Sequence, residues 1–186
     1  MILSNLSVVL AERKLKITDI SNATGISRQT LTNLAYNHGD GIRYETLDTL
    51  CSFLKIAPGE LLLHYPITLT ILEAKETTKA NGDGKYSGAT TLVVLLTIRG
   101  IHYKEAIHTQ GTVFLNEKQK TVPRFYVELE FPSILKTAYE EMPTIFQSEI
   151  TGRIVDKMYK LFSVPDDAIL ELNIVDQLQH DDPFRG

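Results

Sequence analysis

Several features that would narrow the function of a protein are scarce or absent in this chain. It has no tryptophan and a single cysteine, Cys51, so it forms no internal disulfide. No apolar run approaches the length of a membrane span, and residues 1–5 lack the basic flank and cleavage site of a signal peptide. We therefore expect a cytoplasmic protein with no membrane partner.

Motifs for metal ions and nucleotide phosphates are missing as well. There is no His-Glu-x-x-His or paired-cysteine pattern, and residues 81–85 lack the spacing of a phosphate-binding loop. His102 and His108 would lie about 20 Å apart along one strand, too far to share an ion. We predict no metal and no cofactor, and ordinary surface positions for His38, His64, His102, His108 and His180.

An excess of positive charge is also absent, since the net charge is −4. Residues 1–66 contain six basic and six acidic side chains, and the remaining residues contain 13 basic and 17 acidic ones. A protein that coats nucleic acid would be more basic. Any binding to DNA is therefore expected to depend on a few well-placed cations and on a dimer that doubles the contacts.

What the chain does contain is a turn between two short helices, at residues 23–34 (Ala-Thr-Gly-Ile-Ser-Arg-Gln-Thr-Leu-Thr-Asn-Leu). Gly25 stands where a helix ends in a left-handed residue, which glycine adopts at little cost. Ile26 supplies an apolar plug, and Ser27 fits as the N-cap of the next helix. This is the pattern of a helix-turn-helix.

The helix that follows Ser27 is polar on one side and apolar on the other. At about 100° per residue, one side carries Arg28, Gln29, Thr32, Asn33 and Tyr36. Such a face suits a recognition helix in a major groove, where these side chains can pair with base edges. Taken alone, the same pattern also describes an ordinary solvated amphipathic helix.

The neighbouring segments predict further helices. Helical spacing of apolar residues indicates helices over residues 2–13 and 17–24, a helix that carries Leu47, Leu50, Cys51 and Leu54 on one stripe, and a short helix over 58–63. Helices this short should pack as one bundle, because they have no stability alone. Cys51 is then a core residue.

Residues 1–66 resemble the DNA-binding domain of the Cro and phage-repressor family, often called the XRE family. The matching run extends from Leu10-Ala11-Glu12-Arg13 through Ile20 and the Gly25 turn to Tyr44-Glu45-Thr46-Leu47-Asp48-Thr49-Leu50-Cys51 and Pro58-Gly59-Glu60-Leu61-Leu62. The resemblance implies an all-α, five-helix, lambda-repressor-like bundle for residues 1–65. It also implies double-stranded operator DNA as a partner.

Carried over residue by residue, the resemblance implies that Arg28, Gln29 and Asn33 contact bases, with Thr32 as a further candidate. It implies that the DNA backbone is contacted by Ser27, Lys16, Tyr36 and Arg43. For Arg43, the alternative is a solvated loop arginine. Many relatives have a threonine cap and a glutamine where this chain has Lys16 and Ile17. Since lysine cannot cap a helix, we expect the start of that helix to shift to Thr18.

Beyond residues 64–66 the periodicity changes to that of strands. We predict strands over residues 67–72, 90–98, 101–109, 111–115, 123–131 and 168–175, with a turn or mobile loop at 81–84 and a frayed acidic tail. The apolar run 90–98 predicts a strand covered on both faces. Two helices are expected after Pro132, interrupted at Met142-Pro143. Residues 66–186 are therefore predicted to be an α+β domain with an antiparallel sheet and two packed helices.

The function of residues 66–186 is open to several interpretations. Homodimerisation is the leading one, because a two-fold symmetric operator requires two recognition helices. A stripe from Phe146 to Leu161 suggests the interface, and internal packing of that stripe is the alternative. A sensor for an unknown small ligand or peptide is a second interpretation. An enzyme is not expected: a self-cleaving repressor needs a serine activated by a lysine, and Ser133 with Lys136 fits a helix start with a surface lysine.

We therefore predict a sequence-specific transcriptional regulator, a dimeric repressor of a prophage, mobile element or bacterial regulon. The alternative is a helix-turn-helix module that binds a protein partner, as in antitoxin-like regulators.

Overall fold

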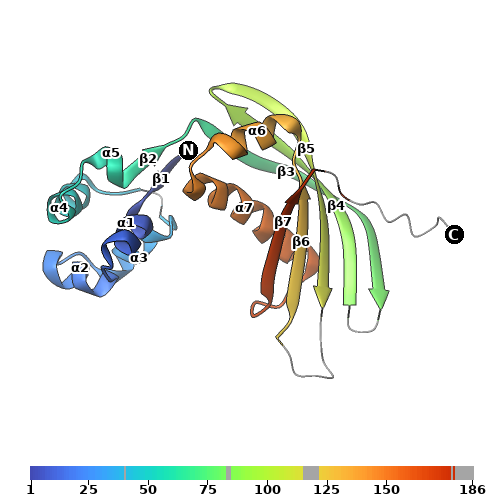
Figure 1. Ribbon diagram of the computed structural model, residues 1–186, viewed down its shortest axis with the longest axis horizontal. Coiled ribbons are helices and arrows are strands. Elements are labelled where there is room, and N and C mark those ends of the chain that lie inside the picture. Colours follow the sequence, from blue (N-terminus) through green and yellow to red (C-terminus); the bar gives the residue numbers. More distant parts are fainter. Residues whose placement is uncertain (40, 83–84, 115–121, 177, 179–186) are drawn as a thin grey trace. The chain divides into compact units, whose positions relative to one another are not determined.

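Contacts divide the chain between Tyr65 and Pro66 into two units, Met1–Tyr65 and Pro66–Gly186. The computed structural model describes residues 1–39, 41–82, 85–114, 122–176 and 178 (Figure 1). Among the helices of these residues, none combines the length and the hydrophobicity that a membrane crossing requires.

The N-terminal unit contains helices and a small two-stranded sheet. In chain order its elements are β1 (Ile2–Ser4), α1 (Leu6–Arg13), α2 (Ile17–Thr24), α3 (Arg28–Ala35), α4 (Tyr44–Leu54), α5 (Pro58–Leu61) and β2 (Leu62–His64). The two strands are antiparallel, with Leu3 opposite Leu63.

The prediction of an all-α five-helix bundle for residues 1–65 is therefore wrong. Ile2–Ser4, assigned to the first helix, is strand β1, and the predicted fifth helix ends at Leu61 because Leu62–His64 is β2. Leu3 fits the helical spacing of Leu6 and Leu10 and is buried, but as part of a strand. The reason is pairing with a segment some sixty residues away, which helical periodicity cannot reveal.

The core of the N-terminal unit is formed by apolar residues from all five helices. Cys51 lies among them as a free, buried thiol, as predicted, and burial raises the pKa of this thiol. The fully buried members include Leu6, Ile20, Leu31, Leu50 and Leu61. Packing around these residues holds the helix-turn-helix, α2 and α3, as a rigid pair.

The C-terminal unit is a five-stranded sheet with two helices. Its elements are β3 (Ile67–Gly82), β4 (Lys85–Ile98), β5 (Ile101–Phe114), β6 (Arg124–Glu130), α6 (Ser133–Glu141), α7 (Thr144–Phe162) and β7 (Ile169–Val175). The strand order is β3-β4-β5-β6-β7. Two strands predicted over residues 101–115 are one long strand, and parts of the predicted turn at 81–84 and of the tail lie outside the described residues.

The predicted antiparallel sheet is also wrong in one respect, because β6 and β7 are parallel. The chain leaves β6, forms α6 and α7, and returns to the sheet in the same direction (Figure 1). A helical crossover of this length is the usual connection between parallel neighbours.

Both helices lie on one face of the sheet (Figure 1). The ring of Phe125 on β6 meets Tyr159 and Phe162 of α7 at centroid distances of 5.2 and 5.9 Å. Along β4, Leu92 and Leu96 on this face are fully buried, whereas residues on the other face, such as Val93, are half-buried. The expectation that residues 90–98 are covered on both faces is therefore not met within this unit.

The apolar stripe of α7 packs inside the C-terminal unit. Phe146, Ile150, Ile154 and Met158 are each at most 1% exposed. These side chains form the layer between helix and sheet, so they are not available to a second copy of the chain. Of the two interpretations of this stripe, a dimer interface and internal packing, the structure shows internal packing.

Candidate nucleic-acid interface

Local chemistry at the turn sets the start of helix α3. Gly25 has φ +75°, a left-handed conformation that ends α2, and its N–H donates to the carbonyl of Ser21 at 3.0 Å. Ser27 Oγ accepts from the N–H of Thr30 at 3.1 Å, which caps α3. The glycine turn and the serine cap predicted from the sequence are both present.

Helix α3 buries Leu31 and Ala35 and directs its polar side chains outward. Arg28 and Gln29 are exposed, and Thr32 and Asn33 are half-buried. Gln29 Nε2 donates to Asn33 Oδ1 at 2.8 Å, one helical turn away. This bond holds two amide side chains side by side, an arrangement that leaves an amide oxygen and further N–H groups for base edges.

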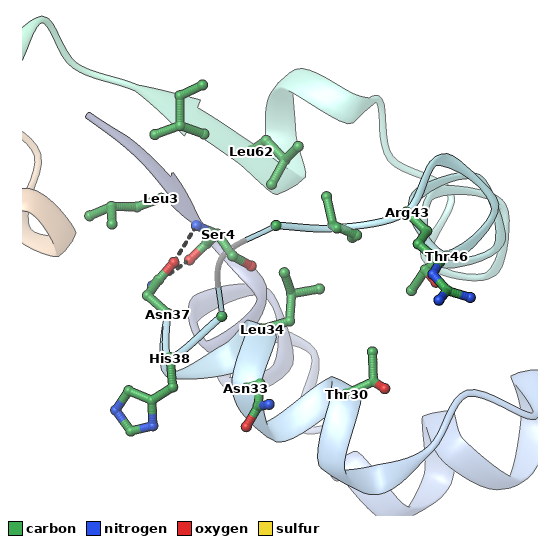
Figure 2. Close-up of a pocket in the computed structure, with 14 residues that line it drawn as sticks. Leu3, Ser4, Thr30, Asn33, Leu34, Asn37, His38, Arg43, Thr46 and Leu62 are labelled. Carbon is green, nitrogen blue, oxygen red and sulfur yellow. Dashed lines mark hydrogen bonds between the residues drawn. The ribbon is translucent and has the colours of Figure 1, made fainter.

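The C-terminal end of α3 is fastened to strand β1. Asn37 has φ +56° and follows the end of the helix. Its Oδ1 accepts from the N–H of Ser4 at 2.6 Å, and its Nδ2 donates to the carbonyl of Ser4 at 3.2 Å (Figure 2). These two bonds fix the helix end to an element that lies early in the chain.

A hollow of about 1000 Å³ opens beside α3 (Figure 2). Asn33 lines it together with Thr30 from the same helix, and Arg43 and Thr46 line it from the start of α4. Neither Thr30 nor Thr46 was among the predicted site residues. Thr30 lies one helical turn before Asn33. This spacing places the two side chains on the same face of α3, so Thr30 could have been predicted from the sequence.

The start of α4 combines a cation with helix-end N–H groups that the N-cap side chain does not cap. Arg43 is its N-cap, is exposed, and makes no side-chain capping bond. The next residue, Tyr44, is 89% exposed, although it was not predicted as a site residue. A guanidinium, a phenol hydroxyl and first-turn N–H groups are all donors that phosphate oxygens accept.

The start of α2 departs from the predicted geometry. The helix begins at Ile17, so the expected shift to Thr18 is wrong. Asp19 supplies the missing cap, since its Oδ2 accepts from the N–H of Lys16 at 3.1 Å. The Lys16 side chain is exposed at this end of α2.

Tyr36 lies at the opposite end of α3 from Arg28 and is 62% exposed. Its ring lies 6.0 Å from that of His38. The structure therefore places the predicted residues at three helix starts and along α3. Of these residues, Asn33 and Arg43 line the hollow and the others lie outside it.

Comparison with known proteins bears directly on this arrangement. Residues 5–66 match the profile of the Cro/C1-type HTH DNA-binding domain. The HTH-type transcriptional regulator YozG of Bacillus subtilis (strain 168), itself uncharacterized, is 36% identical over 61 residues, which are 33% of this chain and 73% of YozG. The chain belongs to the Cro/C1-type helix-turn-helix family.

A solved structure is similar to one third of the chain. It is that of a candidate DNA-binding protein from Bacteroides fragilis, with 24% identity and a TM-score of 0.31, and the match covers 33% of this chain and 98% of that one. The resemblance to the Cro and phage-repressor family is confirmed, and this Cro/C1-type protein is a DNA-binding regulator.

Proposed function

We propose that this Cro/C1-type protein is a sequence-specific transcriptional repressor that binds its operator as a dimer, with α3 in the major groove. The observation that carries the proposal is the outward face of α3. There an exposed arginine stands beside a hydrogen-bonded glutamine and asparagine pair. These are the side chains that pair with guanine and adenine edges.

In the proposed complex Arg28, Gln29 and Asn33 read bases, and Thr32 contacts a base or its methyl group. Arginine forms a bidentate pair with guanine, and an amide side chain forms one with adenine. The bond between Gln29 and Asn33 supports this role because it orients both amides before DNA arrives, which lowers the entropy cost of binding.

The backbone contacts are proposed to come from Ser27, Lys16, Tyr36 and Arg43. Ser27 and Arg43 stand at the starts of α3 and α4, and Lys16 stands at the start of α2. Helix starts attract phosphate through free N–H groups and the helix dipole. Such contacts position the protein and carry no sequence information.

Two copies are proposed to bind one operator, because residues 1–66 have no net positive charge and one recognition helix makes few contacts. Two helices spaced by one turn of DNA double those contacts and match a palindromic site. Occupation of a promoter by this dimer would repress transcription.

The test is selection of genomic DNA fragments by the purified full-length protein and by Arg28→Ala and Gln29→Ala variants. Lys104→Ala, an exposed cation on β5 in the other unit, is the control. We expect a palindromic motif, with one base preference per half-site lost in each α3 variant and none lost in the control. Each lost bidentate pair should weaken binding by about 1–3 kcal/mol. Selection of one unchanged motif by all four proteins would contradict base reading by α3.

A further inference from the structure

The two edge strands of the five-stranded sheet, β3 and β7, differ in how readily they could pair with a further strand. Edge strand β3 has register shifts between Ile71 and Glu73 and between Glu76 and Thr78. It also carries an exposed ion pair, Glu73 with Lys75 at 3.5 Å. Bulges and charges of this kind prevent an edge from accepting another strand.

The opposite edge, β7, has no register shift, and its charged residue Glu171 is paired with Arg124 of the neighbouring strand β6. Its register with β6 runs without interruption from Ile169 to Val175, and Glu171 is its one charged residue. Ile169, Leu170 and Ile174 are 49%, 39% and 37% exposed. Within the described residues β7 pairs with β6 alone, so its outer backbone groups face away from the sheet.

The exposed apolar side chains of β7 continue the core of the C-terminal unit. The register places Leu170 beside Phe125 and Ile174 beside Leu129, on the face that α6 and α7 cover. Phe125 and Leu129 are fully buried, whereas their neighbours on β7 are more than one-third exposed. The apolar layer therefore reaches the sheet edge without being closed there.

The sequence of β7 is close to symmetric about its central residue. In Ile-Leu-Glu-Leu-Asn-Ile-Val, residues equally distant from Leu172 are alike in being apolar or polar. Leu170 matches Ile174, Glu171 matches Asn173, and Ile169 matches Val175. An antiparallel two-fold pairing about Leu172 would place the two residues of each matched pair opposite each other, so that apolar residues meet apolar ones and polar residues meet polar ones.

We propose that β7 pairs antiparallel with β7 of a second copy, with the two-fold axis at Leu172, so that the two five-stranded sheets join into one. This inference rests on the dimer of the proposed function and names its interface. Leu170 then packs beside the partner's Ile174, and the open apolar layers of both copies become one.

The polar side of the strand fits the same pairing. Glu171 stands opposite the partner's Asn173, whose amide donates to the carboxylate. Arg124 Nη1, 3.4 Å from Glu171 Oε1, supplies a neighbouring cation on the outer sheet face. Opposite-charge and amide pairs across strands stabilise a sheet, whereas a register shifted by one residue would place Glu171 beside apolar side chains.

The test uses cysteine cross-linking of the full-length chain with oxidised glutathione. Directly opposed residues of antiparallel strands have Cα atoms about 4.5–5.5 Å apart, within the range of a disulfide. In Leu172→Cys the two new cysteines oppose each other. In the control Ile174→Cys they lie four residues out of register, about 13 Å apart. The native Cys51 is buried and is retained in all variants.

We expect wild type to sediment as a dimer, Leu172→Cys to form a covalent dimer, and Ile174→Cys to stay non-covalent. A wild-type dimer without cross-linking of Leu172→Cys, or equal cross-linking of both variants, overturns the β7 interface and leaves the proposed dimeric function standing. A wild-type monomer on operator DNA overturns both, and base selection by α3 is measured independently of either.

Leu172 is half-buried, so folding of Leu172→Cys is checked by circular dichroism. Should it not fold, equal amounts of Glu171→Cys and Asn173→Cys chains make the same comparison on the other face of the strand. A mixed disulfide between them is expected, and its absence overturns the proposal.

Discussion

Ser27 has one observed role and one proposed role, and one pair of substitutions separates them. Its hydroxyl caps α3, and in the proposed complex it also holds a phosphate. Ser27→Ala removes the cap and should lower the free energy of unfolding by about 1 kcal/mol. Ser27→Asp keeps a capping oxygen but places a negative charge beside the DNA backbone. We expect near wild-type stability in urea denaturation and a large loss of operator affinity in fluorescence anisotropy.

The reverse outcome would be informative in the same experiment. If Ser27→Asp bound operator as tightly as wild type, no phosphate would lie at this position. Ser27 would then be a cap alone.

Asn37 combines a left-handed backbone with two side-chain bonds to Ser4. Asn37→Gly keeps the backbone conformation and removes the bonds, which should lower the free energy of unfolding by about 1–3 kcal/mol. Asn37→Ala adds the cost of a Cβ at positive φ, about 1 kcal/mol more. Urea denaturation followed by circular dichroism measures the difference. Equal stability of the two variants would mean that the chain relaxes out of the left-handed conformation.

Local chemistry explains which individual site residues could be predicted. Gly25 and Ser27 act on the two or three residues next to them, so their conformations follow from sequence alone. Tyr44 and Thr46 were missed because the exposure of Tyr44 and the position of Thr46 in the hollow depend on how α4 packs. No pattern within α4 distinguishes an outer residue near DNA from any other outer residue.

Helix α7 and strand β5 approach closely at Gly111. A Cβ at this position would lie 3.0 Å from the ring of Phe162 and 3.1 Å from that of Phe125. Gly111→Ala should therefore lower the free energy of unfolding by about 1–3 kcal/mol, because both rings must move. Gly152→Ala, inside α7 with nothing within 4 Å of the new Cβ, should instead raise it by about 1 kcal/mol.

Thermal denaturation of both glycine variants checks this contrast. Destabilisation by both would mean that α7 does not tolerate any side chain at position 152. Stabilisation by both would contradict the close packing of α7 on β5.

The spacing of apolar residues predicts the middle of a helix better than its ends. The helix over 28–35 forms where the apolar stripe and the serine cap agree, whereas the helix over 44–54 follows its apolar stripe without a side-chain cap from Arg43. Ile2–Ser4 forms a strand because its partner, Leu62–His64, satisfies its backbone hydrogen bonds. Pairing between distant segments overrides the local helical pattern here, because Leu3 is buried in strand β1 as it would have been in a helix.

The net charge of −4 predicts that binding to DNA depends on a few well-placed cations. If Arg43 contacts one phosphate in each half of a dimer, Arg43→Ala removes two contacts. The slope of log affinity against log salt concentration should then become shallower by about 2. Anisotropy titrations with one operator over a range of salt concentrations measure this slope, and Lys104→Ala should not change it.

A slope change of about 1 would indicate that only one protomer's Arg43 contacts a phosphate. No change at all would support the alternative of a solvated loop arginine.

Some properties of this protein follow from residues near one another in the chain. The helix-turn-helix, its glycine turn, its serine cap and its family resemblance all lie within about sixty residues, and each depends on backbone preference and helical spacing. Only the tertiary structure decided the β1–β2 sheet, the parallel pairing of β7 with β6 and the burial of the apolar stripe of α7. Because that stripe is buried, the exposed edge strand β7 is the proposed dimer interface instead. Pairing and burial join residues far apart in the chain, so they depend on which distant partner lowers the free energy most.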